Sequence, residues 1–157
     1  MVEISRAVAM APAVQLFLES NNSDRVARRG ELIEVLRRPM ILARDAADIV
    51  GVLSYDIWGD DCEILTVHCA RRRSGIGSLL LEALMETARE GGCKGLSVVT
   101  TNDNIDALRF YQRRGFRLTA LRSGAVEEAR REMKPAIPVT GSYGIPLRDE
   151  LELFRRI

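Results

Sequence analysis

The chain has 157 residues, of which 46% are hydrophobic, and its 23 basic side chains nearly balance its 22 acidic ones. This length is typical of one domain with a substantial buried core, so we expect residues 1–157 to form a single domain. The balanced charge argues against a dedicated nucleic-acid-binding or membrane-surface protein, which would carry a basic excess.

The cysteines and the single histidine indicate which metal sites and which cellular location to expect. The three cysteines are odd in number and lack metal-knuckle spacing, which indicates reduced thiols and a cytoplasmic location. His68 is the only histidine, so we expect no multi-histidine metal site and no bound metal. No stretch has the length of a membrane span and the N-terminus lacks a signal pattern, so we expect no membrane partner.

Hydrophobic periodicity and breaker residues predict the elements of the first half of the chain. In order, we expect a strand at 2–6, a helix at 12–19, a second helix capped by Asp24 that ends before Pro39, and strands at 40–44, 49–56 and 63–67. Alternation in the last of these strands places Glu63, Leu65 and Val67 on one face, and Cys62, Ile64 and Thr66 on the other.

The second half of the chain predicts alternating helices and strands. A helix with Ser74 as its cap begins near Ile76, and Gly91-Gly92 ends it. Then follow a strand at 96–101, a helix from Asn104 to Arg114, a strand at 116–122, a helix at 125–133, an irregular proline- and glycine-rich connector at 135–146 and a last strand at 147–154. We expect this last strand at an edge of the sheet.

A glycine turn joins the strand at 63–67 to the following helix, with the sequence Arg72-Arg73-Ser74-Gly75-Ile76-Gly77. Main-chain N–H groups at the start of a helix attract anions, and glycine lets a phosphate approach the backbone closely. The turn therefore predicts a phosphate-bearing ligand. Alternatively, the glycines would allow the helix to pack closely on a strand. Arg71, Arg72 and Arg73 would then be ordinary solvated charges in a surface loop.

Two motifs occur in order on these elements. The first is Arg72-x-x-Gly75-x-Gly77, and the second is Asn104-x-x-Ala107-x-x-x-Tyr111 followed by Arg114-Gly115-Phe116. Together they resemble the GNAT superfamily of acyl-CoA-dependent N-acyltransferases, from the first helix to Phe116. The resemblance implies an α/β fold with a mixed, mostly antiparallel central sheet that is splayed and has helices on both faces. It also implies acetyl-CoA as co-substrate.

The resemblance implies a role for each matching residue. The backbone of Val67 and Cys69 would pair with the pantetheine arm, and Asn104 would bind the cofactor from the other side of the splay. Tyr111 would stand near the thioester sulfur. The N–H groups of the turn would cradle the pyrophosphate, and these belong to Arg72, Arg73, Ser74, Gly75, Ile76 and Gly77. Cys69 stands where many members carry proline, and Arg73 replaces a frequent glycine.

Direct attack by an amine requires a base, because a lysine-like amine with a pKa near 10.4 is mostly protonated at neutral pH. Glu63 is the first candidate and Asp61 the second. Both residues also have a non-catalytic interpretation. Glu63 would be a solvated carboxylate at the end of a strand, and Tyr111 would be a tyrosine of the hydrophobic core. His68 is expected to be structural because alternation turns it away from Val67. Cys69 is expected to be a small apolar filler, since nothing marks it as activated.

These observations predict an N-acetyltransferase that moves an acetyl group from acetyl-CoA to a primary amine by direct attack in a ternary complex. The alternative is a non-catalytic acyl-CoA-binding regulatory module, which would need neither Tyr111 nor Glu63. A small-molecule amine is the favoured acceptor and a protein amine stays open. The acyl chain length and a homodimer also stay open, and Arg71–Arg73 without interleaved aromatic residues does not favour nucleic acid.

Overall fold

The computed structural model describes residues 1–7 and 11–157, which form two compact units. The first unit consists of Met1–Val26, Glu34–Leu96 and Ile157. The second unit consists of Ala27–Ile33 and Ser97–Arg156. No helix within the described ranges is long and apolar enough to cross a membrane.

The first unit is built on antiparallel strands in the spatial order β1-β4-β5-β6. Their bounds are Val2–Ala7 for β1, Met40–Asp45 for β4, Asp48–Trp58 for β5 and Asp61–Cys69 for β6. These strands confirm the sequence prediction. Short turns join β4 to β5 and β5 to β6, so these three strands pair with their neighbours in the chain, while β1 pairs with β4.

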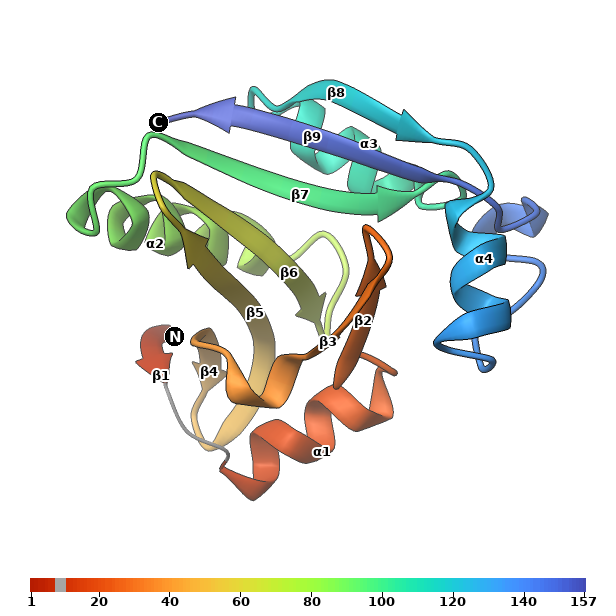
Figure 1. Ribbon diagram of the computed structural model, residues 1–157. Helices are drawn as coiled ribbons and strands as arrows, with labels where there is room; N and C mark the ends of the chain where they lie inside the picture. The colour runs from red at the N-terminus through yellow and green to blue at the C-terminus, as the bar shows by residue number, and fades with distance from the viewer. Residues whose placement is uncertain (8–10) are drawn as a thin grey trace. The chain divides into compact units, whose positions relative to one another are not determined.

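Helices α1 (Pro12–Ser20) and α2 (Ile76–Glu90) cover opposite faces of this sheet (Figure 1). Helix α1 buries Val14 and Leu18 in a cluster that includes Val52 of β5. Helix α2 lies on the other face, where a Cβ built on Gly51 would come within 2.7 Å of the Ile76 side chain. Glycine at position 51 therefore lets α2 pack closely on β5.

A β-bulge in β6 changes the predicted alternation. Ser54 pairs with Thr66 while Tyr55 pairs with Ile64, so Leu65 is an extra residue in β6. Thr66 therefore lies on the face of Ser54, and Glu63 joins it there because it pairs with Asp56, two residues beyond Ser54. The prediction that Glu63 shares a face with Val67 was wrong, because a bulge shifts every later residue to the opposite face.

The prediction of a helix after Asp24 was also wrong. The segment forms a two-stranded sheet of β2 (Arg25–Arg28) and β3 (Glu31–Glu34), followed by a 3₁₀ helix at Val35–Arg37. Arg29 and Gly30 between the strands have φ values of 51° and 75°. Two consecutive left-handed residues make the tight turn that a hairpin requires, and a helix cannot contain them.

The second unit contains strands in the spatial order β7-β9-β8. Strand β7 spans Gly95–Thr101, β8 spans Arg117–Arg122 and β9 spans Glu150–Arg156, with helices α3 at Ile105–Gln112 and α4 at Ala125–Glu132. The last strand lies between its two neighbours, so the prediction that it is an edge strand was wrong, and β8 is the edge.

The proline- and glycine-rich connector before β9 is irregular, as predicted, but hydrogen bonds hold it in place. The Arg130 guanidinium donates to the carbonyl oxygens of Ile137 at 2.9 Å, Pro138 at 2.7 Å and Leu147 at 2.8 Å. The Asp103 carboxylate accepts from the Ser142 N–H at 2.8 Å. The mostly antiparallel sheet with flanking helices confirms the expected α/β fold, while its central splay stays a prediction.

Candidate active site

The glycine turn connects the end of β6 to the start of α2. Gly75 is the N-cap residue of α2, with φ 80° and ψ −6°. A Cβ built on Gly75 would meet no heavy atom within 4 Å, so the backbone here faces open space. The Leu79 N–H donates to the Gly75 carbonyl at 3.2 Å, and the first N–H groups of an α-helix generally lack an acceptor within it. The turn therefore has the geometry of an anion site.

Side chains around the glycine turn support its shape. The Ser74 hydroxyl donates to the Arg71 carbonyl at 2.9 Å, so Ser74 braces the turn. The prediction that Ser74 caps α2 was wrong, because Gly75 is the N-cap and makes no side-chain cap bond. Arg71 lies 3.7 Å from the Asp45 carboxylate, and the side chains of Arg72 and Arg73 are exposed.

Val67 and Cys69 lie at the end of β6 that leads into the turn. Their backbones face Leu53 and Gly51 of β5 in register, and both residues are half-buried. Burial raises the pKa of the Cys69 thiol, which keeps the unreactive thiol form. This observation supports the interpretation of Cys69 as a small apolar residue.

Asn104 and Tyr111 belong to the second unit. The Asn104 side chain caps α3 by accepting from the Ala107 N–H at 3.1 Å, and its contact with a cofactor stays a prediction. Tyr111 is 5% exposed, and its ring packs edge-on against Phe110 and Phe116, with both centroid distances at 5.1 Å. The ring is therefore a core element, and a catalytic role would belong to its hydroxyl alone.

A polar row lies on the α1 face of β5 and β6 and consists of Ser54, Asp56, Glu63, Thr66 and His68. His68 pairs with Val52, Thr66 with Ser54 and Glu63 with Asp56, so the row occupies successive positions of one face. Ser54, Glu63 and Thr66 are 0%, 2% and 8% exposed. Glu63 is therefore buried, and the alternative of a carboxylate in water was wrong.

Both ends of the polar row are hydrogen-bonded. The Arg38 guanidinium donates to the Asp56 carboxylate at 2.5 Å, which offsets the proximity of two carboxylates at Asp56 and Glu63. The Ser23 hydroxyl bonds to Nε2 of His68, and burial lowers the pKa of that imidazole. Asp61, the second candidate base, is exposed beside the turn into β6.

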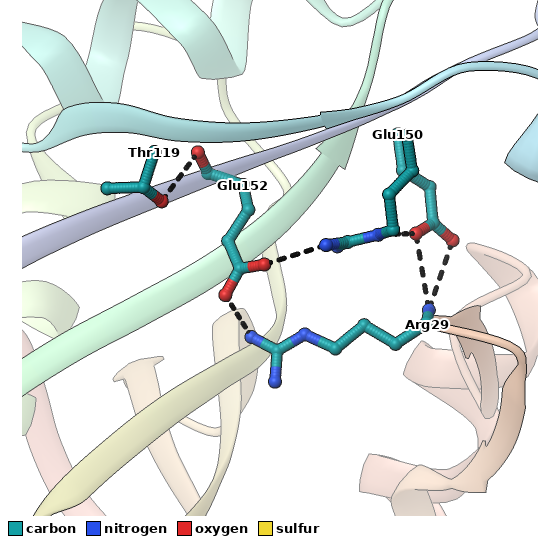
Figure 2. Close-up of polar contacts among 5 residues, drawn as sticks. Arg29, Thr119, Glu150 and Glu152 are labelled. Atoms are coloured by element: carbon teal, nitrogen blue, oxygen red, sulfur yellow. Dashed lines mark hydrogen bonds and ion pairs between the residues drawn. The ribbon is translucent and has the colours of Figure 1, made fainter.

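The second unit contains a separate cluster of charges around Glu150, which is 2% exposed. Figure 2 shows Glu150 and Glu152 facing Arg29 at the tip of the β2–β3 hairpin. The Arg29 N–H donates to the two Glu150 oxygens at 3.3 and 3.2 Å, and its guanidinium bonds to Glu152. Arg122 donates to Glu150 at 3.0 Å and to Glu152 at 2.9 Å. The cluster thus fastens the hairpin tip to β9.

Sequence reasoning missed Ser54, Asp56 and Thr66 as members of the candidate site. A serine and an aspartate inside the apolar run of β5 were the available signal, because alternating polar residues on a buried strand need partners. Across residues 1–7 and 11–157, no group of three or more His, Cys, Asp and Glu side chains is arranged to hold a metal ion.

Comparison with known proteins identifies the family to which this chain is similar. The family model described as "Acetyltransferase (GNAT) family" matches residues 12–116. The uncharacterized protein YxbD of Bacillus subtilis is 45% identical over 116 residues, which cover 74% of this chain and 72% of that protein.

Solved structures agree with this match at the level of the fold. The structure of the IAA acetyltransferase from Bacillus cereus has a TM-score of 0.76 at 23% identity, with 100% of both chains covered. That of a GNAT family acetyltransferase from Elizabethkingia anophelis with acetyl-CoA bound has a TM-score of 0.72 at 20% identity, covering 99% of this chain and 98% of that one. The chain belongs to the GNAT family of acetyltransferases.

Proposed function

We propose that the protein transfers an acetyl group from acetyl-CoA to a primary amine by direct attack in a ternary complex. The single observation that carries this proposal is the glycine turn within the region matched by the family model. Gly75 leaves open space at the start of α2, and the main-chain N–H groups at a helix start attract anions. This arrangement fits a pyrophosphate bound by the N–H groups of Arg72 through Gly77.

The remaining cofactor contacts follow from the resemblance. The backbone of Val67 and Cys69 would align the pantetheine arm, and Asn104 would add a hydrogen bond from its amide. Acetyl-CoA supplies the acetyl group as a thioester. A small-molecule amine is the favoured acceptor and a protein amine is the other candidate. No step calls for a metal ion or a nucleic acid.

Glu63 is the proposed base that takes the proton from the acceptor ammonium. Its burial places a carboxylate on the sheet face that also carries the apolar residues Leu42 and Val52 beside the polar row. A charged group is rarely retained in such surroundings without a functional or structural partner. General-base catalysis of this type contributes about 10²–10⁴ in rate.

Tyr111 is proposed to assist the departing thiolate. A thiol pKa near 8.5 and a phenol pKa near 10 make full proton transfer from the phenol uphill by about 2 kcal/mol. The Tyr111 hydroxyl would therefore donate a hydrogen bond to the sulfur. The packing of its ring against Phe110 and Phe116 would hold that hydroxyl in a constant direction.

Replacing Gly75 by valine tests cofactor binding. The side chain would occupy the open space at the turn, so acetyl-CoA should no longer raise the melting temperature. Binding at 100 times the dissociation constant stabilises a protein by about 2.7 kcal/mol, which makes the loss easy to measure. Gly124→Val is the matched control, because Gly124 is also a helix N-cap with a φ of 74° and open space around it. An unchanged shift in Gly75→Val would contradict the proposed cofactor site.

A panel of primary amines, monitored by release of the free CoA thiol, tests the reaction itself. We expect turnover with at least one small aliphatic amine. If acetyl-CoA raises the melting temperature but no amine or lysine-containing peptide releases thiol, the non-catalytic regulatory module is the better explanation.

A further inference from the structure

The hydrogen bonds of Ser23 determine which nitrogen of the His68 ring carries the proton. The Ser23 hydroxyl contacts two groups, the Asn21 carbonyl oxygen at 3.1 Å and Nε2 of His68. A serine hydroxyl has one hydrogen, and a carbonyl oxygen can only accept a hydrogen bond, so Ser23 donates to Asn21. The other hydrogen bond is then donated by His68, whose Nε2 therefore carries a proton.

The second ring nitrogen, Nδ1, is left as an acceptor. Burial lowers the pKa of His68 from its ordinary value of 6.5, which favours the neutral imidazole at neutral pH. In a neutral imidazole with its proton on Nε2, Nδ1 has a free lone pair. Among residues 1–7 and 11–157, the structure shows one hydrogen bond to the His68 ring, the bond with Ser23. Nδ1 is therefore able to accept a hydrogen bond from a ligand.

His68 occupies the end of the polar row that leads into the glycine turn. Glu63 in the middle of the row is 2% exposed, whereas His68 is half-buried, so the row opens toward solvent at this end. The backbone of His68 lies between Val67 and Cys69, the two residues that the proposed function assigns to the pantetheine arm. The His68 side chain thus extends from the stretch of β6 that would hold the thioester.

The two faces of the sheet differ in access at this point. Helix α2 covers the face opposite His68, because Gly51 pairs with Cys69 and a Cβ on Gly51 would contact the Ile76 side chain. His68 pairs with Val52 and lies on the α1 face. An amine must come within about 3–3.5 Å of the thioester carbon before it reacts. An acceptor that approaches this part of β6 from the α1 face meets the His68 ring.

We propose that His68 binds the acceptor amine, with Nδ1 accepting a hydrogen bond from an N–H of the acceptor, and that Ser23 is a positioning residue that fixes this tautomer. A primary ammonium has three hydrogens, so it can donate to Nδ1 and still give a proton to the base. The inference rests on the proposed function, in which Glu63 is that base. His68 undergoes no net chemical change.

The ¹⁵N NMR spectrum of the imidazole tests the tautomer and the contact directly. The chain contains a single histidine, so every imidazole signal belongs to His68. We expect the proton on Nε2 in the free protein. The amine of the panel with the highest turnover, added well above its KM in the presence of free CoA, should shift the Nδ1 signal. A proton on Nδ1 in the free protein, or an Nδ1 signal that the amine leaves unchanged, overturns the inference.

Two substitutions at His68 separate the roles of the ring nitrogens. The amide of glutamine places a donor near the position of Nε2, and the amide of asparagine places an acceptor near the position of Nδ1. His68→Gln should keep the bond to Ser23 and raise the KM for the amine by about tenfold, with an unchanged KM for acetyl-CoA. His68→Asn should have a KM for the amine closer to that of the parent protein, and a lower melting temperature because Ser23 loses its partner.

Ser23→Ala tests the positioning role without altering the ring. It frees the proton to move to Nδ1, so the KM for the amine should rise by less than in His68→Gln. Ser20→Ala is the matched control, because the Ser20 hydroxyl donates to the Phe17 carbonyl at 3.0 Å near the end of α1, and its KM should not change.

A purely structural role for His68 has a different signature. His68→Gln and Ser23→Ala would then change the melting temperature and leave the KM for the amine unchanged, which overturns the inference. A fall in kcat alone in His68→Gln also overturns it, because His68 would then be the base. Failure of the proposed function is distinct from both, since no amine would release thiol with the parent protein.

Discussion

The glycine turn and the polar row both belong to the first unit, but the turn offers main-chain groups and the row offers side chains. The turn is exposed, and in the proposed function it binds the cofactor through main-chain N–H groups at the start of α2. The polar row is buried and consists of side chains from two strands, with Ser54, Glu63 and Thr66 all less than 10% exposed. The turn is contiguous in sequence, whereas the row exists only through strand pairing.

This difference indicates how each region should respond to substitution. A main-chain site tolerates changes in most of its side chains and is disrupted where a Cβ enters the ligand space, as at Gly75. A buried polar row depends on the side chains that are bonded in it, because losing Arg38 or Ser23 leaves Asp56 or His68 without that partner. Three substitutions outside the turn test this contrast, from the largest expected effect to the smallest.

Glu63→Gln should have the largest effect. Glutamine keeps the shape of the side chain but cannot take a proton, so we expect kcat to fall by about 10²–10⁴ while acetyl-CoA binding is retained. Steady-state kinetics and thermal shift with acetyl-CoA measure the two quantities. Asp61→Asn is the control and should be close to the parent protein. Loss of kcat in Asp61→Asn alone would transfer the role of base to Asp61.

Arg38→Met should reduce stability by about 2 kcal/mol. It removes the partner of Asp56 and leaves that carboxylate facing Glu63 across the strands. Breaking a buried ion pair costs about 3–5 kcal/mol, and the one-third exposure of Arg38 reduces this figure. Urea unfolding measures the change, with Arg37→Met as an exposed neighbouring control. Equal stability of the two variants would mean that the row does not depend on Arg38.

Tyr111→Phe should have the smallest effect of the three. Tyr111 is a motif residue with a buried ring, so phenylalanine keeps the packing and removes only the hydroxyl. We expect kcat to fall by about tenfold, as for the loss of one hydrogen bond in the transition state, with little change in acetyl-CoA affinity. Tyr143→Phe is the control, since its hydroxyl bonds to Asp106 on the surface. Full activity in Tyr111→Phe would leave Tyr111 as a core residue.

Much of the fold was predictable because many elements carry local signals. The apolar spacing of α2, the Gly91-Gly92 stop and the cap at Asn104 depend on residues within one or two turns of each other. The β2–β3 hairpin was not predictable in this way. Its turn has arginine and glycine in left-handed conformations, and arginine is an uncommon residue for such a turn.

The order of the strands in the second unit could not be predicted from the sequence either. Strand β9 alternates like an edge strand but lies between β7 and β8. Polar residues on its faces are explained by partners from distant segments, as Glu150 shows with Arg29 and Arg122. A polar residue in a strand therefore indicates either solvent or a partner, and only the tertiary structure distinguishes the two.

The sequence by itself determined the family, the glycine turn and the placement of Asn104 and Tyr111 on α3, because these features depend on neighbouring residues. The tertiary structure decided which side chains surround Glu63. One extra residue at Leu65 moves Glu63 to the face of Thr66, and pairing with β5 adds Ser54. The bulge depends on how β5 and β6 pair across their hairpin, and the alternation of residues in β6 alone does not specify it.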